Sequence, residues 1–418
     1  MEMTPSRRKF LQSSGALLFG TATSPSQASR AQQSSTGPIE KDYWSLVRSK
    51  FAFSEATVPM NAANLCPSFR AVTETVGTLT YDIDRDCSFN NRAKFRDLLE
   101  HSRHLVAEQL NVSAAEIALV RNTSEANNII NNGIDLNKGD EVLIWDQNHP
   151  TNNVAWDVRA ARFDLVVKRV SSPDSPAIKQ ALIDTFTSQF TPRTRVLSIT
   201  HVSNVSGIKL PVKEIVEAAH AKEIYVHVDG AQVWGAMSLD LKDLDIDSFS
   251  ASAHKWYMGP KEAGLLYVKE RHIDRIWPNI IAPGWGPDVQ TTLPGARKFE
   301  SLGQRDDAGL AAVGVAAREH NDIGSKRTQH RIVELAQRLK TGITELGLEL
   351  VTPMDPELSF GVCITKVPNG NGRSIANRLY TEHGIAAAAT GGVRLCPTIY
   401  NSPEHIDRAI AGMKALMT

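Results

Sequence analysis

The stretch FSASAHKWYMGPK, from Phe249 to Lys261, holds a lysine in an unusual setting. Small, hydroxyl and aromatic residues flank Lys255, whereas a surface lysine usually lies among other charges. Burial among such groups disfavours the ammonium form and lowers the pKa of the amine. A neutral amine is a nucleophile that forms an imine with an aldehyde. We therefore predict that Lys255 reacts with a carbonyl group.

Polar side chains follow several apolar runs, at the points where we expect strands to end. In open α/β sheets, ligands bind just beyond the carboxyl ends of the strands. Each polar set alone has a plain structural explanation, such as a turn or a helix cap. Five sets at five strand ends instead indicate one shared ligand site. The sets include Thr123 and Ser124, Asn148 and His149, His201 and Asn204, Asp229 and Gln232, and His254 and Lys255.

Three of these sets together describe a ligand. Thr123 and Ser124 begin a helix after a strand, and free N–H groups and hydroxyls at such a helix start bind phosphate. Asp229, at the end of a buried strand, suits a protonated ring nitrogen through a charge-assisted hydrogen bond. Lys255 supplies an amine for an aldehyde. Phosphate, protonated heterocycle and aldehyde occur together in pyridoxal 5′-phosphate, and we predict that the chain binds this cofactor.

The elements that position these residues alternate along the chain. Nearly continuous apolar runs predict seven strands, and helical patterns separate several of them. This alternation predicts an α/β fold with a large parallel-rich sheet that helices cover on both faces. The predicted strands are 117–120, 141–145, 164–170, 195–200, 224–228, 247–252 and 264–268, and a long helix is predicted over 91–110.

The chain of 418 residues is long enough for two domains. We predict a leader at 1–31, a linker and N-terminal segment at 32–70, a large cofactor-binding domain at 71–293 and a smaller α+β domain at 294–418. The C-terminal part begins with long helical patterns at 311–324 and 331–346. Strand candidates follow at 348–352, 361–367 and 393–397, and a last helix runs from Pro403 to the end.

The leader places the pair Arg7-Arg8 before a weakly apolar stretch and small residues, in SRRKFLQSSGALLFGTATSPSQA. This pattern is typical of a twin-arginine export signal, with processing after Ala28 or Ala31, although a basic tail rich in serine and threonine is also often plain disorder. We expect the twin-arginine translocase to carry the folded protein to the periplasm, or otherwise out of the cytoplasm. No apolar stretch is long enough to span a bilayer, so we predict no membrane span.

Charge and cysteine content narrow the class of protein. Basic and acidic residues number 46 each and form no basic stripe, so we predict no nucleic-acid binding. Four cysteines are too few for a disulfide framework, and the pairing of Cys66, Cys87, Cys363 and Cys396 stays open. We predict no metal site.

The segment VHVDGAQVWGAM, followed further along by SAHKWYMGPK, resembles the class V aminotransferase group of fold-type I pyridoxal-phosphate enzymes. The resemblance runs over most of residues 61–417 and is strongest to the isopenicillin N epimerase-like branch, which is related to the cysteine desulfurases. It implies a seven-stranded large domain, a smaller C-terminal domain and a homodimer.

The resemblance also implies roles for matching positions. Lys255 would hold the cofactor and move a proton at the substrate Cα, and Asp229 would pair with the pyridine nitrogen. Arg394, in GGVRLCPTIYN, would bind a substrate α-carboxylate through bidentate guanidinium geometry. The remaining contacts would come from His149 over the ring, Gln232 and Asn204 at the phenolic oxygen, Thr123, Ser124, Ser252 and His254 at the phosphate, and Asn64 beside the substrate.

Two departures from the family pattern matter. Desulfurases carry a catalytic cysteine shortly before the carboxylate arginine, but this chain reads GIAAAATGGVR there, so we expect no persulfide mechanism. Cys396, just beyond Arg394, is interpreted as a buried strand cysteine. The family favours Gly-Thr where this chain has Gly303-Gln304, and whether Gln304 reaches the partner's cofactor stays open.

We predict an enzyme that acts at the Cα-amino group of an amino acid or an amino-acid-derived secreted metabolite, with aminotransferase-type chemistry as the main hypothesis. Epimerisation, C–S lysis and oxidative tailoring remain alternatives on the same scaffold. A non-enzymatic binding protein is disfavoured because both Lys255 and Asp229 are present. Several aromatic residues either line the pocket or pack in the core, and these are Trp156, Trp234, Trp256, Trp285 and Tyr400.

Overall fold

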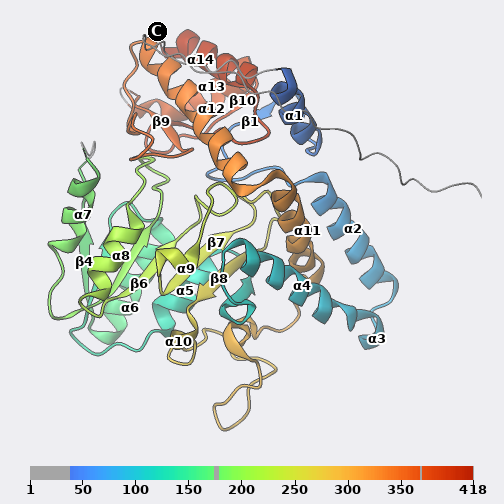
Figure 1. Ribbon diagram of the computed structural model, residues 1–418, viewed down its shortest axis with the longest axis vertical. Helices are drawn as coiled ribbons and strands as arrows, with labels where there is room; N and C mark the ends of the chain where they lie inside the picture. The colour runs from blue at the N-terminus through green and yellow to red at the C-terminus, as the bar shows by residue number, and fades with distance from the viewer. Residues whose placement is uncertain (1–37, 174–177, 368–369, 418) are drawn as a thin grey trace, which may run out of the picture.

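The computed structural model describes residues 38–173, 178–367 and 370–417 (Figure 1). Its centre is a seven-stranded sheet of order β2-β8-β7-β6-β5-β3-β4, in which β8 pairs antiparallel with both neighbours and every other pair is parallel. The strands are β2 (Ile117–Val120), β3 (Glu141–Trp145), β4 (Val166–Val170), β5 (Thr194–Thr200), β6 (Tyr225–Asp229), β7 (Ser248–Ser252) and β8 (Gly264–Val268). All seven predicted strands exist, and the predicted α/β fold is confirmed.

Burial of the strands follows their place in the sheet. The inner strands β3, β7 and β8 are buried along their whole length because helices cover both faces. The edge strand β4 is largely open, and Lys168 and Arg169 lie on it. Charged side chains on an edge strand discourage pairing with another chain.

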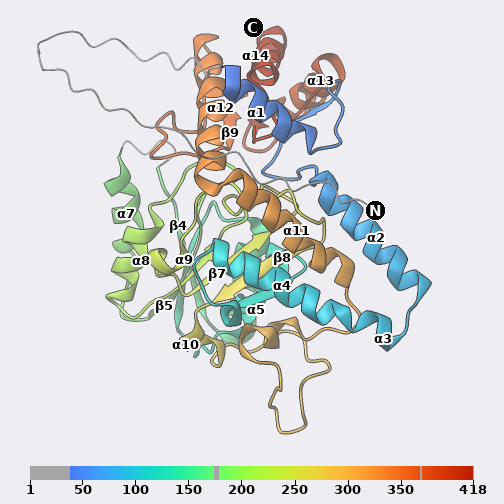
Figure 2. The same ribbon diagram turned by 45° about the vertical axis from the view of Figure 1, so that its right-hand side comes forward.

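Helices surround the sheet and continue into the C-terminal part (Figure 2). They are α1 (Pro38–Ser49), α2 (Arg70–Arg85), α3 (Phe89–Arg92), α4 (Lys94–Gln109), α5 (Thr123–Gly133), α6 (Pro150–Phe163), α7 (Lys179–Thr187), α8 (Val212–His220), α9 (Leu241–Leu244), α10 (Glu270–Ile273), α11 (Asp307–Ile323), α12 (Ser325–Glu345), α13 (Gly372–His383) and α14 (Pro403–Met417). In the part of the chain that the structure describes, no helix is long and apolar enough to cross a membrane.

Two helical expectations were wrong in detail. The helix predicted over 91–110 is divided at Ala93 into α3, which begins earlier, after its cap Ser88, and α4, and Ala93 itself keeps helical backbone angles. The sequence pattern also gave no prediction of α2, in which Val72 is the one buried residue. Gly77 and several β-branched residues give α2 a weak intrinsic propensity, and its packing against α11 stabilises it.

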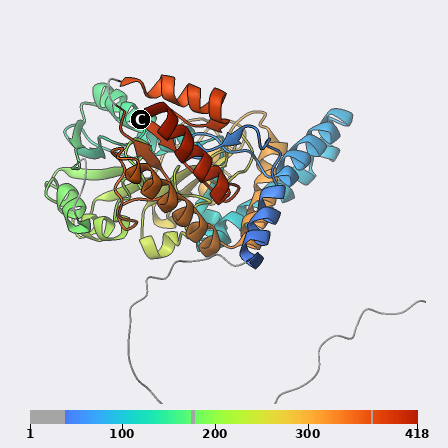
Figure 3. The same cartoon turned by 90° about the horizontal axis from the view of Figure 1, so that it is seen from above.

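The C-terminal part contains a small core that the N-terminal segment completes. β1 (Val58–Pro59) pairs parallel with β10 (Ile385–Ala386), and β9 (Cys363–Thr365) pairs antiparallel with β11 (Val393–Leu395). Seen from above, the red and orange C-terminal helices lie over the sheet (Figure 3). The strand predicted at 348–352 is wrong, since Leu350 makes only an isolated bridge to Thr365.

The predicted boundaries are only partly within the described residues. The leader 1–31, including Arg7-Arg8, lies outside them. The boundary at residue 294 stays a prediction, and α11, which follows it, packs against α2 and α4 beside the large sheet.

Candidate cofactor and active site

The carboxyl ends of the parallel strands place the predicted residues along one edge of the sheet. α5 starts directly after β2, and Asn122 caps it by accepting a hydrogen bond from the Glu125 N–H at 3.0 Å. The Thr123 N–H donates to Ser252 Oγ at 2.8 Å, and the two hydroxyl oxygens lie 2.6 Å apart. The structure therefore joins the two predicted phosphate contacts Thr123 and Ser252, and the half-buried Ser124 lies in the same helical turn.

Asp229 is the last residue of β6 and only 2% exposed. Its Oδ2 accepts a hydrogen bond from Asn127 Nδ2 at 2.9 Å, and its Oδ1 accepts one from the Ala231 N–H at 3.0 Å. Both donors are neutral, so no cation is hydrogen-bonded to this buried carboxylate among the described residues. A buried charge of this kind favours a cationic partner, and the protonated nitrogen of a pyridine ring fits it.

Lys255 follows β7 and is half-buried. Within the described ranges, its Nζ makes no hydrogen bond. Burial lowers the pKa of its amine, Asp229 opposes that shift, and Arg394 adds to it. Burial outweighs the opposing influence of the Asp229 carboxylate, so the pKa of the Lys255 amine is lowered and its neutral, reactive form is favoured.

His149 caps the start of α6, where its Nδ1 accepts a hydrogen bond from the Thr151 N–H at 3.3 Å. Burial lowers the pKa of its imidazole, and the nearby Lys255 lowers it further. A neutral imidazole with a fixed ring position can accept or donate a proton near neutral pH.

Arg394 lies on β11 and reaches the site from the C-terminal part. Its Nη1 donates to the Asn204 carbonyl oxygen at 2.9 Å, and its Nη2 donates to Asn61 Oδ1 at 3.0 Å. The side chain is buried, and its Nε has no partner among the described residues. Two fixed N–H groups hold the guanidinium in one orientation, which is what a carboxylate site needs.

The other predicted contacts are less uniform. Gln232 is buried and contacts Ala63 and Trp256. Burial lowers the pKa of His254 to about 4, and its buried Nδ1 has no partner among the described residues, so it is a neutral hydrogen-bonding group. The side chain of Asn64 is exposed, and its backbone N–H donates to the Asn61 carbonyl at 2.9 Å.

Sequence reasoning missed a buried network behind Asp229. Asn127 Nδ2 donates to Asp229, so Asn127 Oδ1 accepts hydrogen bonds from Ser250 and from His227 Nε2. Burial lowers the pKa of His227 to about 3, and its Nδ1 then accepts from the Ser248 hydroxyl at 2.8 Å. The signal was present, because Asn127 lies one helical turn after Thr123 and His227 lies on the same strand face as Asp229.

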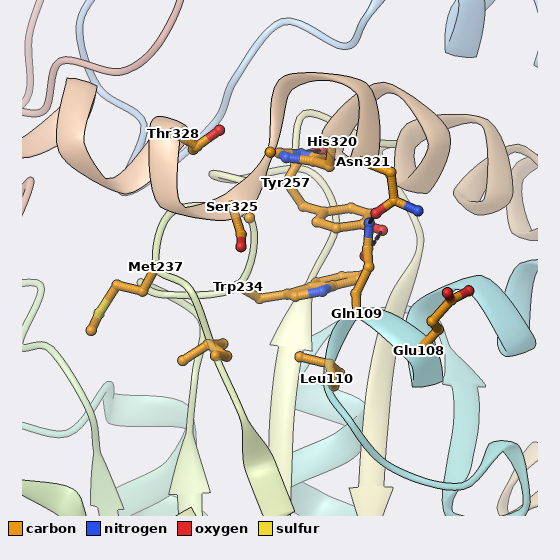
Figure 4. A pocket seen from close by; sticks show the side chains of 13 residues that line it. Glu108, Gln109, Leu110, Trp234, Met237, Tyr257, His320, Asn321, Ser325 and Thr328 are labelled. Carbon is orange, nitrogen blue, oxygen red and sulfur yellow. Dashed lines mark hydrogen bonds between the residues drawn. The ribbon is translucent and has the colours of Figure 1, made fainter. Parts of the chain in front are cut away.

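An aromatic stack supports the lysine loop from behind. The rings of Trp234 and Tyr257 stack with centroids 3.7 Å apart, and Tyr257 stacks on His320 at 4.6 Å. The Tyr257 hydroxyl donates to Gln109 Oε1 at 2.8 Å (Figure 4). The cavity of about 480 Å³ beside this stack is lined by Trp234, one of the aromatic candidates, but by none of the predicted catalytic, cofactor-binding or substrate-binding residues.

The family model for class-V aminotransferases matches residues 85–406. The chain belongs to the class-V aminotransferase family. Isopenicillin N epimerases from Streptomyces clavuligerus and Amycolatopsis lactamdurans are 27% and 26% identical, over 76% and 89% of this chain and 84% and 98% of theirs. A probable cysteine desulfurase from Methanothermobacter thermautotrophicus is 28% identical over 75% of this chain and 84% of its own length.

Solved structures give the same fold. A C-DES variant with glycine linked to its PLP cofactor has a TM-score of 0.80 at 22% identity, covering 88% of this chain and 99% of that one. The apo cysteine desulfurase from Thermococcus onnurineus also has a TM-score of 0.80 at 22% identity, covering 89% and 97%. Class-V family members use pyridoxal phosphate, so this chain is a pyridoxal-phosphate enzyme of fold type I. The predicted cofactor is confirmed, and the individual residue roles stay predictions.

Proposed function

We propose that this class-V enzyme acts at Cα of an amino acid or an amino-acid-derived secreted metabolite, with aminotransferase-type chemistry. One observation carries the proposal. The Lys255 amine has no hydrogen-bond partner among the described residues, and it follows the strand next to the one that ends at Asp229, whose carboxylate accepts hydrogen bonds from neutral donors.

The side chains have separable tasks in this proposal. Pyridoxal phosphate, when bound, withdraws electrons from the bond that breaks at Cα. Asp229 would keep the ring nitrogen protonated, and Thr123, Ser252 and the α5 N-terminus would hold the phosphate. Lys255 would bind the cofactor's aldehyde carbon in the resting enzyme and would then take up the proton that leaves Cα.

Arg394 would select substrates that carry a free α-carboxylate. Asn61 and the Asn204 carbonyl fix its guanidinium, so a carboxylate would meet a preoriented donor. We expect Arg394→Ala to raise KM more than about 10-fold, while Arg394→Lys recovers only part of the loss because an ammonium cannot make the bidentate contact.

A persulfide mechanism is not part of the proposal. The segment between β10 and Arg394 contains no cysteine, and all four thiols are free. Burial raises the pKa of both Cys66 and Cys363 to about 12 and also raises that of Cys396, which keeps these thiols unreactive. The exposed Cys87 follows α2.

Epimerisation is the second candidate. Two relatives are named isopenicillin N epimerase, and His149, whose pKa is lowered by burial and by the charge of Lys255, would provide a second neutral base. Inversion at Cα requires a proton to leave one face and return to the other, which two such groups can serve. C–S lysis and oxidative tailoring remain weaker alternatives.

One experiment separates these reactions. The holoenzyme is incubated with a panel of L-amino acids in deuterated water, and keto acid, Cα deuterium, the opposite enantiomer, ammonia, sulfide and peroxide are measured. Keto acid formed together with Cα exchange supports the aminotransferase proposal, whereas the D-enantiomer without keto acid supports epimerisation. Holoenzyme that exchanges Cα hydrogen of no amino acid or amino-acid-containing peptide would overturn the proposal.

We also propose that the protein is a homodimer exported by the twin-arginine translocase. The leader pattern around Arg7-Arg8 supports export, and the family resemblance supports the dimer. Changing Arg7-Arg8 to Lys-Lys should retain the protein in the cytoplasm. Unchanged recovery from the periplasm would contradict export, and a monomeric mass by light scattering would contradict the dimer.

A further inference from the structure

Trp256 directly follows Lys255, but its side chain contacts a different part of the site. Its indole Nε1 donates to Gln232 Oε1 at 2.9 Å, and both side chains are buried. The Nε2 of the same glutamine donates to the Ala63 carbonyl oxygen at 3.1 Å. One amide therefore connects the loop after β6, the residue beside the lysine and the N-terminal segment.

These two partners determine which way the Gln232 amide points. An indole N–H can only donate, and a backbone carbonyl can only accept. Oε1 must therefore face Trp256, and Nε2 must face Ala63. A reversed amide would leave a buried N–H and a buried carbonyl unpaired, which is costly. The second hydrogen of Nε2 has no acceptor among the residues that the structure describes.

We propose that Trp256 is a positioning residue that holds Gln232 as a hydrogen-bond donor toward the phenolic oxygen of the cofactor. The inference rests on the proposed function of Gln232 at that oxygen. An ionised phenolic oxygen needs a donor, and an amide turned the other way would present its own oxygen instead. Trp256, together with the Ala63 carbonyl oxygen, would thus keep the Gln232 amide in the orientation that donates to this oxygen.

The indole is held on its other side as well. A Cβ at Gly361 would lie 2.7 Å from the indole Cη2, so only glycine allows the ring this close. The Phe360 ring centroid lies 6.4 Å away. Both neighbours precede β9 of the C-terminal part, so Trp256 cannot retreat from Gln232 without moving that segment.

The test replaces the indole N–H and reads the bound cofactor. Trp256→Phe keeps an aromatic ring but removes the donor, and we expect cofactor Kd to rise about 5- to 10-fold. The Gln232 N–H would stabilise the ionised phenolic oxygen of the cofactor. Without this donor, the bound cofactor should keep its proton up to a higher pH. The pH midpoint of the visible absorption change of the holoenzyme should therefore move upward by about half a unit.

Matched variants separate positioning from packing. Trp145 is also fully buried and donates its indole N–H elsewhere, to Ser172 Oγ at 3.2 Å, so Trp145→Phe makes the same truncation away from Gln232. We expect Trp145→Phe to lower Tm without moving the pH midpoint. If Trp256→Phe does not fold, 3-benzothienylalanine at this position keeps the shape and removes only the N–H.

A double-mutant comparison decides the matter. If Trp256 acts through Gln232, Trp256→Phe should shift neither Kd nor the pH midpoint in a Gln232→Ala background. An equal shift in both backgrounds would mean that the indole acts by packing and would overturn the inference. Wild-type Kd and midpoint in Trp256→Phe would overturn it too. Failure of the wild-type protein to bind cofactor would instead count against the proposed function.

Discussion

Two buried carboxylates at opposite ends of the neighbouring strands β6 and β7 have different partners. Asp247 precedes β7 at the amino end, and it accepts hydrogen bonds from His220 Nε2 at 2.9 Å, His272 Nε2 at 2.8 Å and Arg271 Nη2 at 2.9 Å. Asp229 ends β6 at the carboxyl end, where its two hydrogen-bond donors are neutral. Among the described residues, the same residue type thus accepts hydrogen bonds from cationic or protonatable side chains at one end only.

The comparison indicates that Asp247 contributes to stability, whereas Asp229 is available for a ligand. Burial alone would raise the pKa of Asp247, but the hydrogen bonds from His220 and His272 hold it well below its usual range. Asp247 is therefore a self-contained structural carboxylate. The charge of Asp229 and the amine of Lys255 are not matched by hydrogen-bonded counter-ions of the described chain, which is typical of groups kept for a ligand.

The largest effect should follow removal of the amine. Lys255→Ala should abolish covalent cofactor attachment and reduce turnover by about 10³-fold or more, because both the nucleophile and the proton carrier are lost. Intact-mass measurement after borohydride reduction checks attachment, with Lys261→Ala as the control for a nearby lysine. Retained attachment in Lys255→Ala would contradict the whole assignment of the site.

Changing Asp229 should affect activity far more than folding. We expect Asp229→Asn to lower kcat about 10²-fold or more, because a neutral amide cannot keep a ring nitrogen protonated. The unfolding free energy of the cofactor-free protein should fall by less than about 1 kcal/mol, since a buried charge without a cationic partner is replaced by a neutral group. A large loss of unfolding free energy in Asp229→Asn with a normal kcat would show that Asp229 is structural and would contradict the comparison with Asp247.

The matching change at the other end should do the opposite. Asp247→Asn removes the common partner of three side chains, and we expect it to lower the unfolding free energy by about 2–3 kcal/mol. The kcat of the folded fraction should stay within about twofold of wild type, because Asp247 lies at the amino end of its strand. Urea unfolding and steady-state kinetics on one preparation measure both quantities.

The sequence predicted the sheet well because its strands are buried on both faces. Such strands appear as short continuous apolar runs, and β2, β3 and β8 match their predicted bounds. The predictions for α2 and for residues 348–352 were wrong because the local sequence pattern does not determine the structure there. α2 is stabilised by tertiary packing, and residues 348–352 form only an isolated bridge instead of a strand.

Many of the predicted site residues lie at or just after the end of a strand. Asp229, Thr123 and Lys255 were selected by that rule, and the structure brings them to one edge of the sheet, whereas Arg394 was predicted from the family resemblance. Asn127 and the Trp256–Gln232 contact were not found. Their roles depend on which donor meets which acceptor across elements distant in sequence, and residue types and spacing do not specify that.

The smallest predicted effect is a pH dependence at the structural end. The hydrogen bond to Asp247 raises the pKa of His220 despite partial burial, and Asp245 Oδ2 lies 3.2 Å from the other ring nitrogen. A raised histidine pKa stabilises the fold fully below the unfolded value of about 6.5 and loses this effect as pH rises through the folded pKa. The lowered pKa of Asp247 acts in reverse, so its contribution is present above about pH 4 and is lost in stronger acid.

The stability gap between wild type and Asp247→Asn should therefore be widest between about pH 4 and 6.5 and should narrow toward pH 8. His220→Gln keeps a neutral side-chain donor but cannot titrate, so the gap between His220→Gln and Asp247→Asn should be flat from pH 6 to 8. Urea unfolding of the three cofactor-free proteins at several pH values measures both gaps. If the stability gap between wild type and Asp247→Asn widened above pH 7, neutral hydrogen bonds and not the charged histidine would stabilise Asp247. The environments of Asp247 and Asp229 would then differ less than their hydrogen-bond partners indicate.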